Sequence, residues 1–171
     1  MKQIAKHTAR AAILCLFCIL FVLTSCQQNG AYKKDINTKE IANTLKARIP
    51  SPSAWIDEDQ SFIEEYFQLP DYVLESRIYY AQNTNNLDEF GIFVVENGRA
   101  EKLHSLLVHS YLQKRYSENR EWYNSYMPIE TAKLRDAEVR IYGNCVVYAI
   151  LSAERRADFF AECEKLLKNG E

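Results

Sequence analysis

Glycine is scarce in this sequence, and the few glycines are too scattered to form a phosphate-binding loop. There are five in 171 residues, whereas such a loop places several within one short run before a helix. No Gly-x-Ser-x-Gly turn is present to expose a nucleophilic serine. His104 and His109 are five residues apart, whereas a zinc-binding helix carries histidines four apart with a glutamate beside the first. The sequence therefore indicates no catalytic residue, no metal site and no cofactor.

Cysteine is also sparse in the part of the chain that is expected to fold. Of the five cysteines, Cys15 and Cys18 lie in an N-terminal apolar run and Cys26 follows soon after it. Only Cys145 and Cys163 remain, which excludes a disulfide-rich scaffold. These two cysteines could form one disulfide in an exported protein or could be two small buried thiols, and the sequence leaves both alternatives open.

Long apolar runs are absent apart from residues 11–23. These 13 residues are fewer than the roughly 20 that a helix needs to cross a bilayer, so the run disfavours a transmembrane helix. Lys2, Lys6 and Arg10 precede it without any acidic residue, which is typical of an export signal.

The apolar run ends in Leu23-Thr24-Ser25-Cys26, which resembles the lipobox of bacterial lipoproteins. In such proteins the cysteine thiol is lipidated and carries more than one acyl chain in the mature protein, enough for lasting attachment to a membrane. The alternative is an ordinary secretory signal that happens to contain Cys26. We predict a signal peptide over residues 1–25, a lipidated cysteine and tether over 26–36, and one domain over 37–171. The protein would then be exported and lipid-anchored to the outer face of the cytoplasmic membrane.

The chain also carries no excess of positive charge. The formal net charge is −2, and removal of the basic signal would make the remaining chain more acidic. An acidic domain is poorly suited to nucleic acid or to an anionic membrane surface. Nucleic acid is therefore excluded as the expected partner.

The hydrophobic pattern predicts four helices and four strands. Helical spacing of apolar residues recurs in four segments, and strand-like runs separated by turn signals such as Gly143-Asn144 occupy four others. The long third helix ends near either Tyr123 or Asn119, and Met127-Pro128 breaks the chain after it. The predicted helices cover residues 38–49, 62–67, 99–123 and 153–168, and the predicted strands cover residues 72–81, 90–95, 137–142 and 145–151.

This order predicts an α+β domain of the form αα-ββα-ββα. Two hairpins that are each followed by a helix can form one four-stranded, mainly antiparallel sheet with helices packed on one face. The expected architecture is therefore a two-layer sandwich.

Several residues in the second half of the chain, and one acidic-then-apolar stretch before them, resemble a known family. They are Arg115, Trp122, Tyr126-Met127-Pro128, Glu130, Leu134, Ala137, Val139, Gly143-Asn144 and Val146, with residues 88–93 upstream. The sequence resembles, over about residues 38 to 152, the DUF4358-type family of uncharacterised clostridial-type surface lipoproteins. It departs from the family at Asp136, where asparagine is usual, and at Cys145, where tyrosine is usual. The resemblance implies a lipoprotein signal but no activity, cofactor or functional residue.

Aromatic and basic residues gather towards the end of the long predicted helix, and they form the candidate interaction patch. Tyrosine and tryptophan beside arginine are good anchors for a protein or glycan partner. The competing interpretation is that Trp122 and Tyr126 pack in the core while the basic residues pair with Glu118 and Glu121 on a solvated face. The patch consists of Tyr111, Arg115, Tyr116, Trp122, Tyr123 and Tyr126.

These features favour a non-enzymatic interaction or accessory module at the cell surface. The lipid anchor would attach it to the membrane, and its partner would be a membrane-associated or cell-wall-associated protein or glycan. The alternative is an enzyme, or an enzyme accessory, that acts on cell-surface glycans or acyl groups, with His104 or an acidic pair contributing. A two-lobed solute-binding protein is disfavoured because the chain is short for two lobes.

Overall fold

The computed structural model describes residues 31–169 of the chain. The predicted signal peptide, the lipobox residues Leu23, Thr24 and Ser25, and Cys26 lie outside these residues. The helices are α2 (Thr38–Arg48), α3 (Gln60–Phe67), α4 (Ala100–Leu106), a π-helical segment η1 (Leu107–Gln113), α5 (Lys114–Tyr126), α6 (Pro128–Arg135) and α7 (Ala153–Leu167). The strands are β1 (Trp55–Asp57), β2 (Val73–Ala81), β3 (Glu89–Val95), β4 (Glu138–Tyr142) and β5 (Cys145–Ile150).

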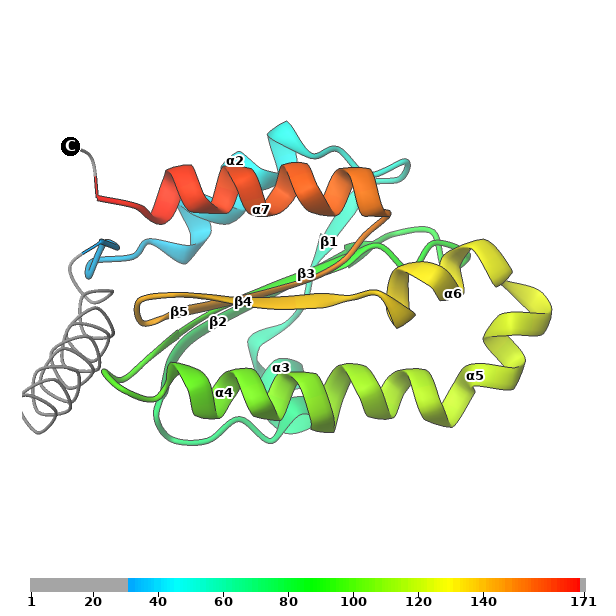
Figure 1. Cartoon of the computed structure of the whole chain (residues 1–171), viewed down its shortest axis with the longest axis horizontal. Coiled ribbons are helices and arrows are strands. Elements are labelled where there is room, and N and C mark those ends of the chain that lie inside the picture. The colour runs from blue at the N-terminus through cyan, green and yellow to red at the C-terminus, as the bar shows by residue number, and fades with distance from the viewer. Residues whose placement is uncertain (1–30, 170–171) are drawn as a thin grey trace, which may run out of the picture.

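The strands form one antiparallel sheet in the order β1-β2-β3-β5-β4. Helices α2 and α7 lie on one side of the sheet, and α3 and α4 lie on the other (Figure 1). Gly143, with φ of 64°, provides the left-handed turn between β4 and β5 that the Gly143-Asn144 dipeptide predicts.

The predicted α+β class, the antiparallel sheet and the two hairpins are confirmed, but the four-stranded two-layer sandwich is wrong. The sheet has five strands, because the short β1 pairs with the end of β2 from Tyr79 to Ala81. Helices also cover both faces rather than one (Figure 1). Every residue of β3 and of β5 is buried, and strands that are apolar on both faces need cover on both.

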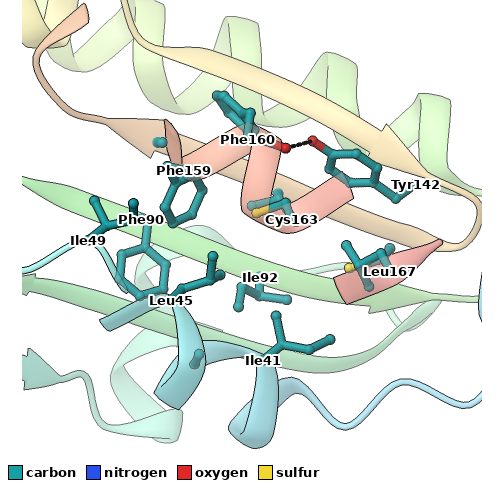
Figure 2. Close-up of a cluster of buried hydrophobic side chains, with 14 of the residues drawn as sticks. Ile41, Leu45, Ile49, Phe90, Ile92, Tyr142, Phe159, Phe160, Cys163 and Leu167 are labelled. Carbon is teal, nitrogen blue, oxygen red and sulfur yellow. Dashed lines mark hydrogen bonds between the residues drawn. The ribbon is translucent and has the colours of Figure 1, made fainter. Parts of the chain in front are cut away.

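The first core cluster lies between the sheet and helices α2 and α7 (Figure 2). Asn37 caps α2 by accepting a hydrogen bond from the backbone N–H of Glu40 at 3.1 Å. The Tyr142 hydroxyl in β4 donates to the Phe160 carbonyl of α7 at 3.3 Å, so a buried phenol joins the sheet to its covering helix. The helical side chains of this cluster include Ile41, Leu45, Phe159, Phe160, Cys163 and Leu167.

The second core cluster lies on the opposite face and is covered mainly by α3, α4 and η1. Ala100, Leu103, Leu107 and Tyr111 lie along the inward side of α4 and η1 and are buried in this cluster. The long helix continues through η1 and α5 to Tyr126, so the end near Asn119 is wrong and the end near Tyr123 falls three residues short. The segment after Met127 is a further helix, α6, which the sequence pattern did not predict.

The two ends of the described chain lie side by side. Tyr32 pairs with Lys168 in an isolated antiparallel bridge, and the backbone N–H of Lys33 donates to the Leu167 carbonyl at 2.8 Å. The elbow between α5 and α6 lies at the opposite end of the molecule (Figure 1). Over residues 31–169, no helix is both long enough and apolar enough to cross a bilayer.

Candidate functional site

A cavity of about 390 Å³ opens between α3, the end of β2 with the loop after it, and the η1–α5 part of the long helix. Its volume falls within the range of roughly 300–1,000 Å³ that is usual for small-molecule sites. Its lining combines an aromatic wall from α3, a polar floor from Glu89, Tyr111 and Arg115, and polar residues from the loop after β2.

Two exposed aromatic rings form the wall of the cavity. Phe62 and Tyr66 lie four residues apart on α3, a spacing that places side chains next to each other on one helix face. Their rings are stacked, with centroids 5.2 Å apart and planes 11° apart. The residues remain 47% and 56% exposed, respectively, although both carry large aromatic side chains. The fold therefore leaves substantial aromatic surface beside a cavity uncovered.

The floor of the cavity contains a buried carboxylate that three side chains hold. The Tyr148 hydroxyl donates to Glu89 Oε1 at 2.6 Å, and the Tyr111 hydroxyl donates to the same oxygen. Arg115 Nη1 donates to Glu89 Oε2 at 2.6 Å and to the Tyr111 hydroxyl, also at 2.6 Å. The Glu89 side chain is 8% exposed, so its charge depends on these partners rather than on water.

Burial and the nearby carboxylate set the protonation of this network. Burial raises the pKa of Tyr111 well above its usual value, and the negative charge of Glu89 raises it further. The pKa of Tyr148 is raised well above its usual value for the same two reasons. Burial alone would lower the pKa of Arg115, but the charge and hydrogen bond of Glu89, together with Tyr111 and Tyr148, outweigh burial, and the pKa is raised. Both phenols therefore stay protonated as donors and the guanidinium stays charged.

Arg115 has donor capacity left over for a ligand. Its hydrogen bonds to described residues all leave from Nη1, so Nε and Nη2 have no partner among residues 31–169. The side chain is 21% exposed and lines the cavity. A guanidinium carries five N–H donors in a rigid fork, and those on Nε and Nη2 remain available.

Asp88 forms a second buried ion cluster, next to Glu89 in the chain. Lys133 Nζ of α6 donates to Asp88 Oδ1 at 2.8 Å, and Arg155 of α7 donates to Oδ2. Burial alone would raise the pKa of Asp88, but the hydrogen bonds and positive charges of Lys133 and Arg155 together outweigh burial, and the pKa is lower than usual. This carboxylate joins the two helices to the start of β3.

The predicted interaction patch separates into an inner and an outer group. Tyr111 is buried and Arg115 is partly buried, and both belong to the floor of the cavity. Tyr116 and Tyr123 are partly buried against the second core cluster. The sequence predicts one patch on one helix, but the structure divides these residues between the floor of the cavity and the second core cluster.

Trp122 and Tyr126 form the outer group and do not pack in the core. They are 54% and 72% exposed, respectively, and their ring centroids lie 5.5 Å apart. The interpretation that places these two residues in the core is therefore wrong. Lys114 does pair with Glu118, at 3.8 Å on an exposed surface.

The histidines and cysteines do not converge on the cavity. His104 is partly buried on α4 and does not line the cavity, and His109 is exposed, with Nδ1 3.1 Å from Gln113 Oε1. Cys145 and Cys163 are both free and buried, so the disulfide alternative is wrong. Burial raises the pKa of Cys145 to about 12. Over the described part of the chain, no cluster of three or more histidine, cysteine or acidic side chains could hold a metal ion.

Comparison with known families matches residues 55–151 to the family described as a domain of unknown function, DUF4358. The chain belongs to this family. The matched region runs from the first residue of β1 to the residue after β5, so it includes the whole sheet and every residue that lines the cavity. No curated protein and no solved structure matches the chain.

Three of the residues that shape the cavity were not predicted from the sequence as site residues: Phe62, Tyr66 and Glu89. The spacing of Phe62 and Tyr66 predicted a helix here correctly but carried no information on whether their rings are exposed. Glu89 carried a signal that could have been used, because an acid at the head of a wholly apolar strand requires a buried partner. That partner, Arg115, lies 26 residues away in sequence and only tertiary packing identifies it.

Proposed function

We propose that this protein is a lipid-anchored, non-enzymatic binding module on the outer face of the cytoplasmic membrane, and that the cavity beside α3 is its recognition site. The observation that carries the proposal is the pair of exposed, stacked rings of Phe62 and Tyr66 at a cavity of small-molecule size. Exposed aromatic anchors beside a pocket are characteristic of recognition sites.

The arrangement of charges in the cavity supports binding rather than catalysis. Glu89 accepts hydrogen bonds from three donors, so both of its oxygens are already engaged within the floor of the cavity. Hydrolysis of a glycosidic bond generally uses a pair of carboxyl groups. Glu58 lines the cavity, but Asp88 is paired with Lys133 and Arg155, Glu89 is held by its three donors, and His104 lies elsewhere on α4. The geometry therefore favours the interaction module over the enzyme.

The sequence supports the membrane anchor. The basic start, the short apolar run and Leu23-Thr24-Ser25-Cys26 together have the form of a lipoprotein signal. Four residues separate Cys26 from Ala31, the first described residue, and even a fully extended tether of that length spans less than about 20 Å. The domain would therefore sit close to the membrane, with partners in the envelope within reach.

The anchor is tested by replacing Cys26 with serine and following the protein through cell fractionation. The native protein should be found in the membrane fraction and should carry fatty acid, whereas Cys26→Ser should be found outside it. Equal distribution of both proteins, or the absence of fatty acid on the native protein, would overturn the anchoring.

The recognition site is tested by crosslinking in intact cells, with Tyr66→Ala and Trp122→Ala as a matched pair. Both residues are exposed aromatics, at 56% and 54%, but only Tyr66 lines the cavity. Tyr66→Ala should lose crosslinks to envelope components while keeping its circular dichroism spectrum and its membrane location, and Trp122→Ala should keep them. The reverse result would move the recognition site to the outer pair on α5.

A further inference from the structure

We infer that the cavity binds a neutral saccharide, with a sugar ring lying against the aromatic wall of α3. The inference rests on the proposed function, because it names the ligand class of the same site. Three properties of the cavity carry it: the aromatic faces, the unused polar groups in the same lining and the sign of the local charge.

The aromatic wall suits the apolar face of a sugar ring. Phe62 and Tyr66 form a nearly parallel pair and keep about half of their surface exposed. Tyr66 is held in turn by an edge-on contact with Tyr111, with centroids 6.2 Å apart and planes 85° apart. A ring platform that is already ordered loses little conformational entropy when a flat ligand packs against it.

The rest of the lining suits the hydroxyl groups at the edge of such a ring. Arg115 presents unused Nε and Nη2 donors at the floor. Gln82 and Thr84 are exposed in the loop after β2, and their side chains have no hydrogen-bond partner among the described residues. Glu58 adds a carboxylate acceptor at the same cavity. Donors and acceptors thus surround an apolar wall, which matches a ligand with an apolar face and a polar rim.

The charge of the lining disfavours an anionic ligand. Glu58, Asp88 and Glu89 line the cavity with Arg115 as its only cation among the described lining residues. Asp88 is paired with Lys133 and Arg155, which leaves Glu58 and Glu89 against the single guanidinium. An added carboxylate or phosphate would meet net negative charge.

A purely apolar ligand is disfavoured for the opposite reason. An acyl chain that filled the cavity would remove the unused nitrogens of Arg115 from water without replacing their hydrogen bonds. Unpaired buried donors, charged ones above all, are costly. A neutral polyhydroxylated ring can pack its apolar face against the aromatic wall and can accept hydrogen bonds from the polar floor.

Isothermal titration calorimetry on the full-length protein tests this inference. The protein is purified from membranes in a detergent without a sugar headgroup, so that the detergent does not compete. The probes are cellotriose, maltotriose and chitotriose as neutral saccharides, a galacturonic acid trimer as an acidic one, and octanoate as an acyl chain. At least one neutral trisaccharide should bind, and more tightly than the acidic trimer or octanoate.

The matched variants locate the binding. Tyr66→Ala should weaken the affinity for the neutral trisaccharide by about tenfold or more, because it removes half of the platform. Trp122→Ala, which removes an equally exposed ring outside the cavity, should leave the affinity within about twofold. Circular dichroism confirms that both variants are folded.

Several outcomes would overturn the saccharide inference. It fails if none of the three neutral trisaccharides binds, if octanoate or the acidic trimer binds more tightly, or if Trp122→Ala weakens binding as much as Tyr66→Ala. Failure here is distinguishable from failure of the proposed function. If crosslinks in cells still depend on Tyr66 while no saccharide binds, the recognition site stands and only its ligand class is wrong.

Discussion

Asp88 and Glu89 are adjacent in the chain, yet their carboxylates hold elements on opposite faces of the sheet. Asp88 pairs with Arg155 of α7 on the side of the first core cluster and with Lys133 of α6. Glu89 binds Tyr111 of η1 and Arg115 of α5 on the side of the second cluster. Asp88 directly precedes β3 and Glu89 is its first residue, so two neighbouring acids connect helices of both layers to the start of this strand.

Removing the Glu89 carboxylate should destabilise the fold strongly. Glu89→Ala leaves the Arg115 guanidinium and two buried phenols without their common acceptor. Loss of one partner of a buried ion pair costs about 3–5 kcal/mol. Urea unfolding measured by circular dichroism should show this fall in the free energy of unfolding. Glu118→Ala, which removes the exposed pair with Lys114, serves as the control and should change it by less than about 1 kcal/mol.

Acidification should reduce the contribution of Asp88 to the free energy of unfolding. The pKa of Asp88 in the folded protein is lower than its ordinary value of 3.8, so the unfolded chain takes up the proton first as the pH falls. The stabilisation is therefore complete above the unfolded pKa and is lost as the pH falls through the folded pKa. The difference in unfolding free energy between the native protein and Asp88→Asn should be constant from about pH 7 to pH 5 and should shrink below about pH 4. A difference that grows on acidification would contradict this account.

Gly91 should not tolerate even a methyl group. A Cβ atom at this position of β3 would lie 2.2 Å from Cε1 of Tyr148 and 2.9 Å from Cε2 of Phe93, and both rings are buried. Gly91→Ala must displace Tyr148 from Glu89, so it should lower the free energy of unfolding by about 2–3 kcal/mol or more. Thermal denaturation gives the measurement. Gly98→Ala is the comparison, because its Cβ would meet no atom within 4 Å and only the positive φ of 78° opposes it; a cost there of about 1–2 kcal/mol is expected.

The two core cysteines should be unreactive in the folded protein. Burial raises the pKa of Cys145 to about 12 and that of Cys163 well above its usual value, and only a thiolate reacts readily with a disulfide reagent. In a variant of the mature chain that carries Cys26→Ser, a thiol reagent at about pH 8 should modify neither cysteine until denaturant is added. Rapid modification of the native protein would show that the first core cluster opens to solvent.

The local elements could be predicted from the sequence, whereas their arrangement in layers could not. Periodicity identified α2, α3, α7 and four of the five strands because each carries its own apolar pattern. The strand β1, Trp55–Asp57, has only three residues, too few to show a period, and it exists through its pairing with Tyr79–Ala81. Residues 90–95 are apolar on both faces of the strand, a pattern typical of a strand covered on both sides, so this run is inconsistent with the two-layer prediction.

The candidate site could be predicted only in part. Tyr111 and Arg115 were identified from their place on the long helix, but on a patch with Trp122 and Tyr126 rather than in the floor of a cavity. The cavity depends on β3 bringing Glu89 against η1 and on α3 lying across the end of β2, and both are long-range contacts. Exposed rings at Phe62 and Tyr66 have the same spacing in sequence as buried ones, so periodicity could not separate them.

The bridge between Tyr32 and Lys168 has a practical consequence for labelling. A reporter fused beyond α7 would emerge beside Tyr32 and Lys33, at the start of the described chain. If the proposed lipid anchor holds, such a reporter would crowd the end of the domain that faces the membrane, and it would leave the elbow between α5 and α6 clear (Figure 1). A reporter inserted at that elbow would occupy the opposite end and the neighbourhood of Trp122 and Tyr126.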